Sequence, residues 1–89
     1  MIRTKIYVGM TTQKGVLLNA DEVRDLVKQN KDACTIQQAT GIWKGEQENT
    51  LIIEIIQEEK EVVLPYLLKN ELDQESVLVM YDRPEIEFI

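Results

Sequence analysis

Carboxylates and one thiol are the side chains of this sequence that could do chemistry. Glutamates are concentrated in the middle of the chain, at Glu46, Glu48, Glu54, Glu58, Glu59 and Glu61. Paired carboxylates can act as general acid and base or hold Mg²⁺, and neither use requires a fixed spacing in the sequence. A carboxylate-based enzyme is therefore one hypothesis, ranked behind binding functions. The acids after residue 57 are better explained as a solvated helix start, where the helix dipole favours negative charge.

Other catalytic chemistry lacks its usual residues. The sequence contains no histidine, the commonest general base and metal ligand. With Cys34 as the only cysteine, zinc and iron–sulfur sites have too few ligands, and no intrachain disulfide can form. No phosphate-binding glycine loop, dinucleotide fingerprint or nucleophile elbow occurs. We interpret Cys34 as a buried, inert thiol, and we predict no catalytic residue, no metal and no cofactor.

The charge balance favours some partners over others. The chain has 89 residues, and its net charge is −6, with scattered basic residues. Nucleic-acid binding needs clustered Lys and Arg, so we predict no nucleic-acid partner. An acidic surface favours solubility or a basic partner protein. The N-terminus lacks the apolar core of a signal peptide, and no apolar run could span a bilayer. We therefore expect a cytoplasmic protein that does not bind a membrane.

Hydrophobic periodicity locates the elements that would position these side chains. Alternation predicts strands at residues 2–8, 34–44, 50–56 and 76–81, with a turn at 45–49 and a short strand-like tail at 85–89. Asn19, followed by Asp21 and Glu22, predicts the start of a helix over residues 20–30. A second helix is indicated between residues 58 and 72. Pro65 favours a late start for it, near residues 61–64.

The element order β-α-β-β-α-β predicts an α+β fold in a single domain, residues 1–89. The economical arrangement is a ferredoxin-like sandwich, with a four-stranded antiparallel sheet and both helices on one face. The first and third strands should be central. The strand over residues 50–56 is the most apolar, which fits that position.

This fold leaves one face of the sheet without helices. Large apolar side chains should point there, with Leu78 and Met80 as further candidates and Tyr7, Trp43, Ile52 and Ile56 as interface anchors. Lys5 and Glu54 should form a cross-strand ion pair on it. We expect a second copy of the chain to cover this face, in a dimer or trimer, because small domains gain most from added burial. The alternative is that loops or the tail at 84–89 cover it within one chain.

Several short motifs resemble a known group of proteins. Residues 39–43 end a strand in a Gly-x-aromatic motif, and residues 48–55 place a glutamate before an apolar strand. With residues 4–9 and 73–79, these motifs resemble small proteins of phages and mobile elements of Gram-positive bacteria, similar to the broader DUF3574-like set. The resemblance implies a ferredoxin-like fold and a phage or mobile-element origin, and it implies no activity. The turn at residues 43–46 is faintly similar to CutA-type and PII-type regulators, which form trimers, but their long ligand-binding loop is missing here.

The leading hypothesis is a non-enzymatic accessory protein that binds a host or phage protein through this sheet face. Glu46 and Glu48, in an acidic turn, would set partner choice through charge. The alternative is a homo-oligomer that binds or sequesters a small ligand such as a nucleotide signal. That function would require basic residues to gather at a subunit boundary, with Arg3, Lys5, Lys44 and Arg83 as candidates.

Overall fold

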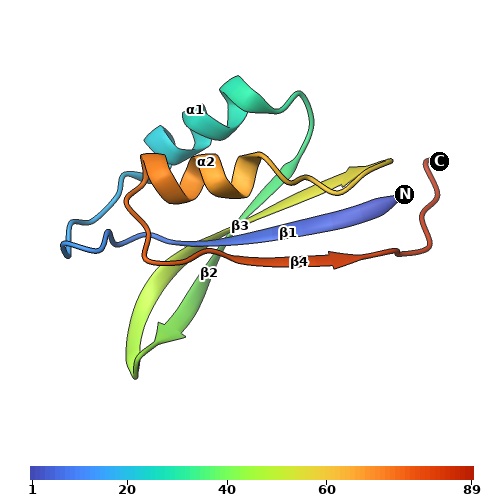
Figure 1. Cartoon of the computed structure of the whole chain (residues 1–89). Helices are drawn as coiled ribbons and strands as arrows, with labels where there is room; N and C mark the ends of the chain where they lie inside the picture. Colours follow the sequence, from blue (N-terminus) through green and yellow to red (C-terminus); the bar gives the residue numbers. More distant parts are fainter.

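The computed structural model describes all 89 residues and has one four-stranded antiparallel sheet and two helices. The elements in chain order are β1 (Ile2–Gly9), α1 (Ala20–Asn30), β2 (Thr35–Trp43), β3 (Glu46–Gln57), α2 (Leu64–Glu71) and β4 (Leu78–Asp82). The strand order is β2-β3-β1-β4, so the predicted central position of the first and third strands is confirmed. Both helices lie on the same side of the sheet (Figure 1). Neither helix has the length and apolar content needed to cross a bilayer.

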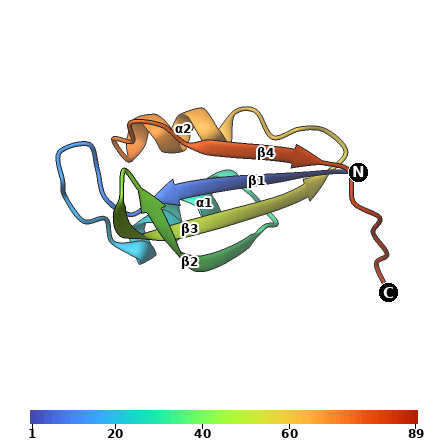
Figure 2. The same ribbon diagram turned by 90° about the horizontal axis from the view of Figure 1, so that it is seen from below.

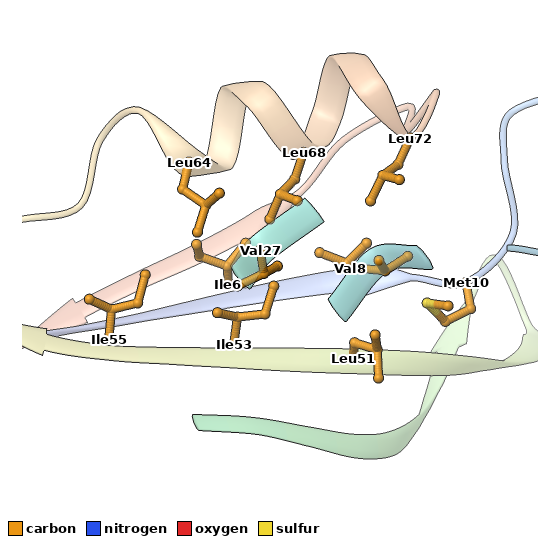
Figure 3. Close-up of a cluster of buried hydrophobic side chains, with 11 residues drawn as sticks. Ile6, Val8, Met10, Val27, Leu51, Ile53, Ile55, Leu64, Leu68 and Leu72 are labelled. Atoms are coloured by element: carbon orange, nitrogen blue, oxygen red, sulfur yellow. The ribbon is translucent and has the colours of Figure 1, made fainter. Parts of the chain in front are cut away.

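Alternation along the two central strands builds the core. Figure 3 shows the buried side chains between sheet and helices; the strands contribute Ile6, Val8, Leu51, Ile53 and Ile55. The helices contribute Val23, Val27, Leu64, Leu68 and Leu72. Each such side chain contributes roughly 1.5–3 kcal/mol on burial. The core therefore fixes which residues of each strand point away from the helices.

Helix α1 begins and ends where the sequence predicts. The Asn19 side chain accepts hydrogen bonds from the backbone N–H groups of Asp21 (2.8 Å) and Glu22 (3.4 Å). These bonds satisfy donors that have no partner within the helix.

Helix α2 starts late because Pro65 lies in its first turn. Residues 58–63 are not helical. The Glu61 carboxylate accepts from the backbone N–H groups of Val63 (3.1 Å) and Leu64 (2.9 Å), so it caps the helix from outside. Glu61 is only 8% exposed, and its inclusion among solvated acids was wrong. Burial is tolerated because Glu61 is also paired with Lys31, at 2.7 Å.

The hairpin between β2 and β3 turns in two residues. Lys44 (φ 52°) and Gly45 (φ 77°) both lie in the left-handed region, which is typical of a type I′ turn. The predicted turn at 45–49 is therefore wrong, and Glu46 and Glu48 lie in β3, opposite Trp43 and Gly41. A two-residue turn lets pairing continue through these polar positions, whose lack of apolar alternation hid the strand.

The C-terminal segment does not form the predicted strand. Strand β4 covers Leu78–Asp82 rather than 76–81, and residues 83–89 are in no strand. Asp82 already pairs with Arg3, so β1 has almost no residues left for a longer β4, and Pro84 has no N–H to donate. The tail leaves the sheet at the end of β4 (Figure 2), with Phe88 80% exposed. It does not cover the helix-free face.

Candidate functional site

The open face is the sheet surface opposite the helices, formed by alternate residues of all four strands. Two neighbouring rows of register partners cross its middle: Ile52, Tyr7 and Leu78 in one, and Glu54, Lys5 and Met80 in the other. Leu78 is 59% exposed and Met80 52%. The Lys5 ammonium lies 3.8 Å from the Glu54 carboxylate, so the predicted ion pair is confirmed. The open face thus combines large exposed apolar side chains with paired charges.

A hollow of about 490 Å³ lies at one end of the open face. It is bounded by the end of β1 and its following loop, by the β2–β3 hairpin, and by the segment that enters β4. Figure 1 shows the hairpin curving away from the helices, which makes this end of the open face concave. Its lining includes the side chains of Tyr7, Trp43, Lys44, Glu46, Glu48 and Glu75.

Lys44 links two walls of the hollow. Its ammonium donates hydrogen bonds to both carboxylate oxygens of Glu75, at 3.2 and 3.3 Å. The same ammonium lies 5.8 Å from the centroid of the Trp43 ring, within cation–π range. Both partners of the ion pair are well exposed, so the pair contributes only about 0–1 kcal/mol. Lys44 thus holds the hairpin tip near β4 through a weak contact.

Two glycines shape the floor of the hollow. A Cβ atom on Gly9 would lie 2.6 Å from Glu48 Oε1, so the Glu48 carboxylate occupies the space above Gly9. A Cβ atom on Gly41 would lie 2.5 Å from Thr50 Oγ1. Both distances are far below van der Waals contact. The absence of a side chain at Gly9 and Gly41 therefore lets the Glu48 and Thr50 side chains lie close to the backbone of β1 and β2, respectively.

The structure brings four of the six predicted site residues together. Tyr7, Trp43, Glu46 and Glu48 line the hollow. Ile52 is the register partner of Tyr7 and adjoins it. Ile56 also belongs to the open face, but it pairs with Arg3 at the opposite end.

Glu75 is the site residue that the sequence did not reveal. Its contact with Lys44 joins residues 31 positions apart and depends on the curvature of the hairpin. No pattern in the sequence encodes that curvature. Exposed Leu78 was predicted as a further open-face residue, and it also lines the hollow.

The basic residues proposed for nucleotide binding do not all gather within one chain, since Arg3 and Lys5 lie near Asp82 and Lys44 lies at the hollow. The Arg3 guanidinium makes a two-bond contact with Asp82, with Nε 2.8 Å from Oδ1. This bond lowers the pKa of the Asp82 carboxyl and raises the pKa of Arg3. Lys44, by contrast, lies at the hollow. No three His, Cys, Asp or Glu side chains are grouped so that they could hold a metal ion.

Glu61 is more buried than predicted, and Cys34 is more exposed than predicted. Burial tends to raise the pKa of the Glu61 carboxyl, but hydrogen bonds from Lys31 and Leu64 outweigh it and the net pKa is lowered. Tyr81 Oη donates to the Glu61 carbonyl at 3.4 Å.

Cys34 is exposed, so its predicted burial is wrong; it precedes β2, outside the sheet. Partial desolvation raises the pKa of its thiol, although Lys31 opposes this, so little reactive thiolate forms.

Comparisons with protein-family models, with curated proteins and with solved structures gave no match. The resemblance to phage and mobile-element proteins stays a prediction. The open face and its hollow are therefore the features of this chain that indicate a function.

Proposed function

We propose that this chain is a non-enzymatic accessory protein that acts by binding another protein through its open face. The observation that carries the proposal is the exposure of large apolar side chains on a sheet face that no part of the chain covers. Trp43 (52%), Leu78 and Met80 are all more than half exposed there. Exposed apolar groups that share one surface are typical of interaction sites.

The proposal includes self-association, in a dimer or trimer. A domain of 89 residues buries a smaller share of its surface than a large domain, so it gains more from a covered sheet face. A two-fold interface would place the row of Ile52, Tyr7 and Leu78 against the same row of a second copy.

We further propose that the fold is ferredoxin-like. The βαββαβ order, the antiparallel pairing and the strand order β2-β3-β1-β4 all support this assignment. A cytoplasmic location and a phage or mobile-element origin remain part of the proposal. A fold shared by many functions says nothing about activity, so the open face carries the functional argument.

The proposal is tested by measuring molar mass with light scattering after size-exclusion chromatography, at micromolar and submillimolar concentrations. We expect a dimer or trimer, and we expect Met80→Lys on the open face to shift it toward monomer. Val63→Lys is the matched control. Val63 is also an exposed apolar residue, but it lies between β3 and α2, outside the open face.

Binding to a different protein needs a separate measurement. A photo-crosslinking amino acid at Leu78 should trap a partner in the producing cell, and the same group at Val63 should not. A monomer at every concentration, together with no crosslink specific to Leu78, would refute the proposed function.

A further inference from the structure

We propose that the hollow binds an arginine side chain of the partner protein and that Lys44 is the internal cation which this arginine displaces. The inference rests on the proposed function and deepens it, because it names the chemistry of the partner. The carboxylates and Trp43 of the hollow lie outside the row that would mediate self-association, whereas Tyr7 and Leu78 of that row also line the hollow.

The charges around the hollow favour a cation. Glu46, Glu48 and Glu75 supply three carboxylates, and Lys44 is the one basic residue among the lining residues. The local formal charge is therefore −3 + 1 = −2. Glu46 and Glu48 form no ion pair within the chain, since the five pairs of the structure involve other acids. An incoming cation would find unpaired carboxylates there.

The aromatic side chains favour the same kind of ligand. Trp43 and Tyr7 both line the hollow. Aromatic faces attract cations, and a guanidinium also stacks on them through its flat shape. The contact of the Lys44 ammonium with Trp43, at 5.8 Å, shows that a cation is already accommodated in this position.

The position of Glu48 favours arginine over lysine. Its carboxylate lies over Gly9, in space that any other residue at position 9 would fill. A carboxylate in this place can accept two parallel hydrogen bonds from a guanidinium, whereas an ammonium is a point charge. Arginine can thus use Glu48 and an aromatic ring together.

Displacement of Lys44 is inexpensive. Its side chain and that of Glu75 are 67% and 56% exposed, so water can replace their ion pair at little cost. Once Lys44 moves away, Glu75 becomes a third free carboxylate. Lys44 therefore acts as a competitor whose removal should strengthen binding.

The test uses the fluorescence of Trp43, the only tryptophan of the chain. The probe is a blocked peptide of alternating arginine and glycine, titrated into the intact protein at low salt. Control peptides carry lysine, or citrulline, which has the shape of arginine without its charge. We expect saturable quenching with the arginine peptide, weaker binding of the lysine peptide and none of the citrulline peptide.

Two pairs of variants locate the site. Glu48→Gln should weaken binding about tenfold, since it removes a charge-assisted acceptor. Glu59→Gln removes an exposed acid outside the hollow and should change nothing. Lys44→Ala should tighten binding about threefold through loss of the competitor, whereas Lys28→Ala, on α1, should have no effect.

Several results would overturn the inference. Equal quenching by the citrulline peptide would show that charge plays no part, and unchanged binding by Glu48→Gln would remove the site. Equal tightening by Lys44→Ala and Lys28→Ala would indicate general attraction to an acidic protein. Far-UV circular dichroism of each variant checks folding. Because the light-scattering test depends on Met80, self-association in a protein that binds no arginine peptide would leave the proposed function standing.

Discussion

Replacement of Glu61 by alanine should destabilise the domain by about 1.5–4 kcal/mol, a large share of the ~5–15 kcal/mol typical of a domain. Two losses combine. The backbone N–H groups of Val63 and Leu64 lose their acceptor, and loss of a helix cap costs about 0.5–2 kcal/mol. Lys31 also loses its carboxylate partner at 2.7 Å.

The second loss is smaller than for a fully buried charge. Breaking a buried pair costs about 3–5 kcal/mol when the remaining charge has no other partner. Here the Lys31 side chain is 20% exposed, and its ammonium also donates to Gln57 Oε1 at 3.0 Å. We therefore assign about 1–2 kcal/mol to this loss, at the low end for charged groups that lose a partner. Glu61→Gln keeps an acceptor for the helix start, so it should cost less than Glu61→Ala.

Urea unfolding followed by far-UV circular dichroism measures the effect, with Asp21→Asn as control. Asp21 pairs with Arg24 on the surface of α1, where such a pair contributes only about 0–1 kcal/mol. A cost of Glu61→Ala no larger than that of Asp21→Asn would refute the assigned role. A double-mutant cycle with Lys31→Ala should show coupling, because the two side chains are in direct contact.

The contribution of Glu61 to stability should depend on pH with a defined sign. The pKa of Glu61 is lowered in the folded state, so the unfolded chain takes up its proton first on acidification. The extra stability is therefore complete above the ordinary glutamate pKa and disappears as the pH falls through the lowered folded pKa. The stability difference between the wild type and Glu61→Gln should shrink over that range. A difference that stays constant on acidification would contradict the ionised pair.

Three further predictions concern the hairpin, the hollow and the thiol. Gly45→Ala should destabilise the domain by about 1 kcal/mol in urea unfolding, because position 45 has a positive φ of 77°; no change would argue against the type I′ turn. Gly9→Ala should push the Glu48 carboxylate out of its place, weakening arginine-peptide binding while changing the melting temperature little. Cys34 should react with iodoacetamide at neutral pH more slowly than a free cysteine peptide, since its pKa is raised, and mass spectrometry would reveal the opposite result.

Strand faces and helix starts were predictable because they depend on local patterns. Alternation in β1 and β3 assigned Tyr7, Ile52 and Ile56 to the open face correctly, and Asn19 located the start of α1. Pro65 indicated the late start of α2. Each of these features is set by residues close together in the chain.

Several of the errors concern features that depend on distant contacts. The tail could form no strand because β1 has few residues beyond Arg3, which requires knowledge of the register between β1 and β4. Glu61 is buried because Lys31 reaches it and because its own N–H donates to Thr4 Oγ1 at 3.2 Å. The Lys44–Glu75 contact depends on hairpin curvature in the same way. Charge and hydrophobic periodicity alone do not determine which of these residues come into contact.

The pairing of β1 with β4 has a mechanical consequence. The two strands are antiparallel neighbours, and Arg3 and Asp82 pair at the end of the sheet where the chain enters β1 and leaves β4 (Figure 2). Force applied at these two points, as in optical tweezers, would act on the hydrogen bonds between β1 and β4 one pair at a time, beginning at Arg3 and Asp82. Such unzipping needs far less force than shearing all the β1–β4 hydrogen bonds at once. We therefore expect β4 to separate from β1, starting at that edge, while α1 and the hairpin are still folded.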